Sequence, residues 1–207
     1  MVENGMTKET LLEAIRVMYN SIDELINSLL GLAKRQGVNI DCKKGCEWCC
    51  HQAIFANSHE VHFLADYMAA HFSADQMKTV LQRAKDKNGK VEHLSMEELL
   101  NFKSPCPLLK DGQCSAYEAR PMACRIYLSR NLSSCIDFFK HPENKNNFPA
   151  LLDFPLRAGR MMNEGFNAAL KSQNLNSTEY RIEQGMIIAA TSVSMKDNQL
   201  KNLPLYL

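Results

Sequence analysis

The sequence predicts a mainly α-helical fold that carries a cysteine-rich loop region and one short irregular β-hairpin. Over long stretches the apolar residues recur at steps of three and four, which is the period of an amphipathic helix. Oxygen-bearing capping residues stand in front of several of these stretches, and strand-like alternation is scarce. A stretch with prolines and an Asp-Gly pair interrupts the helical pattern in the middle of the chain.

The first predicted helix begins at Thr7 and ends near Gly37. Its apolar residues share one face of a helix because they return every three or four positions. Gly37 is a suitable stop, since glycine readily adopts the backbone conformation that ends many helices. A cysteine segment follows, from Asp41 to Cys50. The predicted apolar face consists of Leu11, Ile15, Met18, Ile22, Leu25, Leu29 and Leu32.

Three more helix starts lie in the middle of the chain. Asn57-Ser58-His59-Glu60 combines an oxygen-bearing cap with an acid in the first turn, and it leads into Val61, Leu64, Ala65 and Met68. The sequences Ser73-Ala74-Asp75-Gln76 and Ser95-Met96-Glu97-Glu98 fit the capping-box pattern. The helix that opens after Ser73 is expected to end near Asn88-Gly89.

The hairpin is expected between Ser104 and Tyr117. Pro105 and Pro107 bracket Cys106, and Asp111-Gly112 is typical of a tight turn. A short helix is predicted over Met122 to Leu128, and helical patterns return from Ala150 to Lys171 and from Thr178 to about Val193. We therefore expect a single domain, 1–207, with a cysteine core at 42–127 and flanking helices at 1–40 and 150–195.

Length and charge exclude several classes of protein. A chain of 207 residues can bury a core without cross-links, so its eight cysteines are not needed as disulfide staples. The net charge is +1 and no stretch concentrates Lys and Arg, which argues against a nucleic-acid partner. The amino-terminal residues do not resemble a secretory signal, and no stretch approaches the ~20 apolar residues of a membrane span. We expect a cytoplasmic protein, and reduced cytosolic thiols favour metal binding over disulfides.

The first cysteine group lies in DCKKGCEWCC and consists of Cys42, Cys46, Cys49 and Cys50. On a continuous helix these positions would share one face, so buried apolar thiols are the alternative interpretation. Gly45 and the charged residues between the cysteines speak against such a helix. Thiolates spaced by two or three residues can bind one zinc ion or an iron–sulfur cluster. Because neighbouring thiols are hard to aim at one ion, Cys49 or Cys50 is expected to serve a second site, a bridge or the core.

The second group consists of Cys106, Cys114 and Cys124, with Cys135 further along the chain. Each alone would be read as a buried thiol, but next to the first group they are candidate ligands. A structural zinc ion takes about four ligands, so seven or eight cysteines would complete two such sites or one larger cluster.

Basic residues near the cysteines are candidates for charge compensation. Four thiolates on a divalent ion leave a net charge of about −2. Arg125 follows Cys124 directly and is the best candidate to donate to the thiolates, whereas Lys43 and Lys44 fit a solvated surface equally well. His51 is a further candidate ligand, and capping or surface roles are expected for the other pair, His59 and His62.

The pattern resembles a known family. Cys42-x3-Cys46-x2-Cys49-Cys50, then Cys106-Pro-x-Leu, Gly112-x-Cys114, Tyr117 and Arg120-Pro-x-x-Cys124-Arg, is similar to the CxxCxxCC family of zinc- or iron-chelating proteins, also called YkgJ-like. The first spacing has three intervening residues where the family's name gives two, and Cys135 falls outside the pattern. The resemblance implies a small, mainly helical metal-binding domain. The implied metal ligands are Cys42, Cys46, Cys49, Cys50, Cys106, Cys114 and Cys124.

Three functions are compatible with these residues. The first is a metal-binding module that holds zinc, iron or an iron–sulfur cluster, since no phosphate loop, dinucleotide fingerprint or specific Ser–His–acid set is present. The second is an iron–sulfur enzyme that uses S-adenosylmethionine, because Cys42-x3-Cys46-x2-Cys49 matches the cysteine spacing of radical enzymes of that type. An enzyme of protein lysine methylation belongs to the same alternative, because some members of the family that the chain resembles are described as flagellin N-methylases. The third is reversible thiol oxidation. The sequence leaves open whether the protein is an enzyme.

Overall fold

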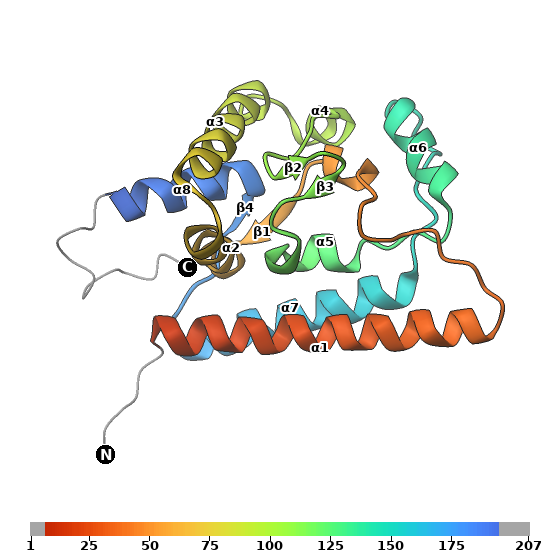
Figure 1. Cartoon of the computed structure of the whole chain (residues 1–207), viewed down its shortest axis with the longest axis horizontal. Coiled ribbons are helices and arrows are strands. Elements are labelled where there is room, and N and C mark those ends of the chain that lie inside the picture. The colour runs from red at the N-terminus through yellow and green to blue at the C-terminus, as the bar shows by residue number, and fades with distance from the viewer. Residues whose placement is uncertain (1–6, 195–207) are drawn as a thin grey trace, which may run out of the picture.

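The prediction of a mainly α-helical fold is confirmed by the computed structural model, which describes residues 7–194 (Figure 1). Residues 1–6 and 195 of the predicted flanking segments lie outside the described residues. The helices are α1 (Lys8–Arg35), α2 (Ser58–His71), α3 (Ala74–Val91), α4 (Met96–Asn101), α5 (Met122–Ile126), α6 (Leu132–Lys140), α7 (Asp153–Ser172) and α8 (Ile182–Ser194). Two short 3-10 helices are η1 (Trp48–His51) and η2 (Tyr117–Ala119).

Helix α1 begins and ends where the sequence predicts. The Thr7 side chain accepts a hydrogen bond from the main-chain N–H of Thr10, and Gly37 follows the helix with φ at +71°. The predicted apolar face is buried from Leu11 to Ile22, so this part of the prediction is confirmed. The prediction is wrong for Leu25 and Leu32, whose side chains are exposed. Ile26 takes the place of Leu25 in the core because a helix of 3.6 residues per turn carries position 26 back to that face.

Helix α3 runs past its predicted end. It continues through Gly89 to Val91, whereas the sequence indicated a stop near Asn88-Gly89. The Val91 side chain is fully buried, so burial of this residue outweighs the unfavourable helix propensity of one glycine. The capping boxes predicted at the starts of α3 and α4 are confirmed: Ser73 caps α3 and Ser95 caps α4.

Two small antiparallel sheets complete the described residues. Strands β2 (Leu109–Lys110) and β3 (Gln113–Cys114) form the predicted hairpin, with φ of +49° at Asp111 and +76° at Gly112. Strands β1 (Phe55–Asn57) and β4 (Glu179–Arg181) form a second sheet that the sequence did not predict. The predicted last helix is therefore shorter, because residues 179–181 pair with β1 and α8 begins only at Ile182.

The core has two large clusters and a small one that consists of Ala56, Val61 and Ala189. One large cluster joins α1, α5 and α7; α1 and α7 lie along the lower edge of the molecule in Figure 1, and α5 packs on α7. The other joins α2, α3 and α8 to Cys106 and Leu108, and Cys50, Cys114 and Cys124 pack against it. Within residues 7–194, none of the helices combines the length and the apolar character needed to cross a membrane.

Candidate metal centre

The first cysteine segment is a series of turns, so the alternative of a continuous helical face of thiols is wrong. Gly45 has φ at +88°, and the main-chain N–H of Cys46 donates to the Lys43 carbonyl at 3.1 Å. Only then does η1 begin, where the Cys50 N–H donates to the Glu47 carbonyl at 2.8 Å. All four thiols of this segment are half-buried.

Main-chain hydrogen bonds hold the second cysteine group against the first. The Cys106 N–H donates to the Cys50 carbonyl at 2.7 Å, and the Ser104 N–H donates to the His51 carbonyl at 2.9 Å. Cys114 then lies on β3, and Cys124 lies in the short helix α5. Segments far apart in the sequence are thus joined backbone to backbone beside η1.

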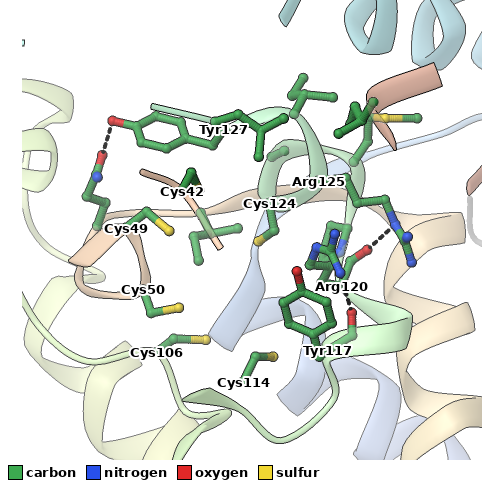
Figure 2. Close-up of a pocket in the computed structure, with 18 of the residues that line it drawn as sticks. Cys42, Cys49, Cys50, Cys106, Cys114, Tyr117, Arg120, Cys124, Arg125 and Tyr127 are labelled. Carbon is green, nitrogen blue, oxygen red and sulfur yellow. Dashed lines mark hydrogen bonds between the residues drawn. The ribbon is translucent and has the colours of Figure 1, made fainter. Parts of the chain in front are cut away.

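These segments enclose a cavity of about 740 Å³ that all seven predicted cysteines line. Figure 2 shows the sulfur atoms of Cys50, Cys106, Cys114 and Cys124 turned toward a common space. Within residues 7–194, no three His, Cys, Asp or Glu side chains are already arranged so that they could hold an ion. The donor set nevertheless fits zinc or iron, since zinc ions and iron–sulfur clusters both prefer thiolate ligands.

Burial sets the protonation of most of these thiols. It raises the pKa of Cys106 to about 12 and that of Cys42 to about 11, and it raises the pKa of Cys124, Cys114 and Cys46 as well. Without a bound cation the thiols keep their protons at neutral pH. A cation that binds here must therefore displace protons.

Cys49 differs from its neighbours. A hydrogen bond from the Cys50 thiol lowers the pKa of Cys49, and the positive charge of Arg120 acts in the same direction. The same hydrogen bond and burial raise the pKa of Cys50. Cys49 is thus the thiol of the first segment that ionises most readily, which makes it the natural first ligand for an incoming cation.

Arg120, rather than the predicted Arg125, is the arginine that acts on the thiols, and Lys87 acts on Cys106. The Arg120 guanidinium lowers the pKa of Cys49, Cys114 and Cys124, in each case against a larger effect of burial. It stacks on the Tyr117 ring, 3.8 Å from the ring centroid. Arg120 is therefore placed to compensate the charge of thiolates in the cavity.

Arg125 is buried and engaged elsewhere. It forms an ion pair with Asp23 of α1, its Nε donates to the Arg120 carbonyl at 2.9 Å, and it also donates to the Glu118 carbonyl. Its guanidinium lies over the Tyr19 ring at 4.0 Å. The residue ties the main chain before α5 to α1 and so holds Arg120 in place (Figure 2).

The remaining predicted polar residues lie away from the cavity or at its rim. Lys44 is exposed and forms an ion pair with Glu118 at 3.1 Å. His51 Nδ1 lies 3.2 Å from the Glu47 carbonyl oxygen, and its ring packs on Phe139. The surface role expected for His59 is wrong: its side chain is fully buried, because α2 lies between the two core clusters.

Sequence reasoning missed the buried Glu60. Its Oε1 accepts hydrogen bonds from the Tyr19 hydroxyl at 3.0 Å and from the Met122 N–H at 2.7 Å, and its Oε2 accepts from the Asn57 N–H at 2.9 Å. One side chain thereby joins α1, α2 and the start of α5, which carries Cys124. The acid in the first turn was visible in the sequence, but nothing local indicated its burial.

Helix α6 was also missed. Its signals were an oxygen-bearing cap at Asn131 and the apolar residues Ile136 and Phe139. The helix packs on η1, where the rings of Trp48 and Phe139 lie 5.3 Å apart. It carries Cys135, so the eighth cysteine lies beside the first segment.

Comparison with known proteins gives one family. The model of a family named CxxCxxCC, with the description "Putative zinc- or iron-chelating domain", matches residues 41–148, which is more than half of the chain. The match includes all eight cysteines. Searches among curated proteins and among solved structures found no match.

Proposed function

The chain belongs to the CxxCxxCC family, and on this premise we propose that it binds zinc or iron through thiolates of Cys42, Cys46, Cys49, Cys50, Cys106, Cys114 and Cys124. The observation that carries the proposal is that all seven residues, from two distant segments, line one cavity. A bound cation would supply cross-links between these segments, and an iron–sulfur cluster would supply in addition the capacity to carry an electron.

Several properties of the cavity support metal binding over disulfide formation. All eight cysteines are free thiols, and burial keeps most of them protonated. A disulfide would join only two sulfurs, whereas the cavity collects several from the loop, the hairpin and α5. The Arg120 guanidinium supplies positive charge beside the thiols that would become thiolates.

The proposed role is structural or that of a carrier. The spacing Cys42-x3-Cys46-x2-Cys49 also suits an iron–sulfur enzyme that uses S-adenosylmethionine, but such enzymes resemble a parallel α/β barrel. The strands of residues 7–194 form only two short antiparallel pairs. No observation favours that alternative, or lysine methylation, over binding alone. A reducing compartment such as the cytoplasm would keep the thiols available as ligands.

Anaerobic purification followed by elemental analysis and visible absorption tests the proposal. We expect at least about one equivalent of zinc or iron per chain, and a thiolate-to-iron absorption band if the metal is iron. Cys106→Ser is expected to lower the metal content, whereas Ser172→Ala, at the exposed end of α7, should leave it unchanged. Protein that holds neither metal and takes up neither on anaerobic reconstitution would overturn the proposal.

A further inference from the structure

A second, much smaller cavity lies beside the first. Its walls include four thiols, those of Cys42, Cys46, Cys49 and Cys135, and it is closed by Trp48, Tyr127, Ser129 and Leu132. Its volume is about 10 Å³, close to that of one water-sized sphere. The space suits a single ion and excludes a cluster.

The walls of the two cavities divide five of the eight thiols. Cys135 lines the smaller cavity and not the larger one, whereas Cys50, Cys106, Cys114 and Cys124 line the larger cavity and not the smaller one. Cys42, Cys46 and Cys49 line both cavities.

The thiols of Cys49 and Cys50 are hydrogen-bonded to each other, but the backbone ties the two residues to different segments. In a 3-10 helix successive side chains leave the axis about 120° apart, so the two side chains start in different directions. Cys50 is drawn to the second segment, because its carbonyl accepts from the Cys106 N–H at 2.7 Å. Cys49 remains for the first segment, whose other end is fixed where the Cys42 N–H donates to the Ser129 carbonyl at 3.2 Å.

Helix α6 brings Cys135 to the same place without help from the second cysteine group. The Leu132 N–H donates to Asp41 Oδ2 at 2.9 Å, next to Cys42. Further along α6, the Phe139 ring packs against Trp48 and His51 of η1, with centroids 5.3 and 5.0 Å apart. Contacts at both ends of the first segment thus hold Cys135 over it.

We infer that the eight cysteines form two separate four-thiolate sites, and that Cys135 completes a mononuclear site with Cys42, Cys46 and Cys49. The other site consists of Cys50, Cys106, Cys114 and Cys124, which face the larger cavity (Figure 2). The inference rests on the proposed function and adds to it a ligand, a count of two ions and the assignment of Cys49 and Cys50 to different ions.

Titration of reduced, metal-free protein with Zn²⁺ against a chromophoric chelator tests this division, because it counts the ions bound. Wild-type protein is expected to bind two equivalents. Cys135→Ser and Cys114→Ser should each bind one, and the double variant should bind none. Asp137→Asn, on an exposed position of the same helix as Cys135, should keep both equivalents. Co²⁺ in place of Zn²⁺ should give tetrahedral thiolate bands that fall by about half in each single variant.

The outcomes separate the two proposals. Wild-type protein that binds no Zn²⁺ would overturn the proposed function and this inference together. Two other outcomes would overturn the two-site division and leave the proposed function standing. In the first, wild-type protein binds one equivalent of Zn²⁺ and Cys135→Ser still binds it. In the second, Cys135→Ser binds two equivalents, as wild-type protein does. If Cys135→Ser loses its helical circular dichroism, Cys42→Ser and Cys46→Ser replace it: one equivalent in both supports the division, and two equivalents in either overturns it.

Discussion

Replacement of Glu60 by glutamine is expected to destabilise the protein and to loosen the helix that carries Cys124. The Glu60 side chain is 1% exposed and accepts from the Tyr19 hydroxyl, the Met122 N–H and the Asn57 N–H. Glutamine keeps the shape of the side chain but turns one of its two acceptor oxygens into a donor. Either orientation of the amide then places its NH₂ group against a main-chain N–H, at Met122 or at Asn57.

The magnitude follows from that one unpaired donor. The Tyr19 hydroxyl can rotate and accept a hydrogen bond, but a main-chain N–H cannot change its role. A buried donor without an acceptor costs about 1–3 kcal/mol, and hydrogen bonds to an ionised group are stronger than neutral ones. We therefore expect Glu60→Gln to lower the free energy of unfolding by about 2–3 kcal/mol, or the melting temperature by about 4–12 °C for a domain of this size.

Urea unfolding followed by far-ultraviolet circular dichroism measures this change. Zinc affinity should fall in parallel, because Met122 is the first residue of α5, the helix that carries Cys124. Glu98→Gln is the matched control, since Glu98 holds the equivalent capping position in α4 and is exposed. It should change stability far less. Equal effects of the two substitutions, or no measurable effect of Glu60→Gln, would refute the argument that burial of the three contacts determines the cost.

Three further predictions concern packing and protonation. Gly159→Ala should cost about 1–3 kcal/mol in urea unfolding, because its Cβ would overlap the Ile126 side chain, whereas Gly165→Ala on the same helix meets no atom and should stabilise by about 0.5–1 kcal/mol. Burial lowers the pKa of His59 to about 4, so on acidification the unfolded chain takes up a proton at this residue before the folded chain does. The free energy of unfolding should therefore fall by about 3 kcal/mol from pH 6.5 to 4, and His59→Gln should lack this loss. Burial raises the pKa of Cys106 to about 12, so this thiol should contribute a loss of about 1.4 kcal/mol per pH unit to the stability of metal-free protein above pH 9. A Cys106→Ala profile with the same slope as wild-type protein would contradict this.

The sequence predicted the elements whose signals are local. Thr7, Ser73 and Ser95 cap their own helices, and Asp111-Gly112 makes its own turn, so a few neighbouring residues decide these structures. The β1–β4 sheet was missed because each strand has only three residues and its partner lies far along the chain. The end of α3 was misplaced for a similar reason, since burial of Val91 depends on tertiary packing.

The site was predictable as a set of residue types but not as an arrangement. The cysteine spacing indicated which thiols would gather, and all seven line one cavity. The sequence could not distinguish Arg120 from Arg125, because both pair with Asp23 on a distant helix and only the tertiary packing buries Arg125 against Tyr19. Cys135 was left outside the pattern because its proximity to Cys42 depends on how α6 packs against η1.

The order in which the ribosome makes these residues has a consequence for the thiols. Cys50, Cys114 and Cys124 pack against a core cluster that Ile182 and Met186 of α8 complete. Met186 is synthesised about 140 residues after Cys50, which at ~5–20 residues per second takes about 7–30 s. During that interval the nascent thiols lack their cover and are open to oxidants and to any cation in the surroundings. The choice of metal in the cell is therefore open to kinetic competition on the ribosome as well as to the equilibrium affinity of the folded chain.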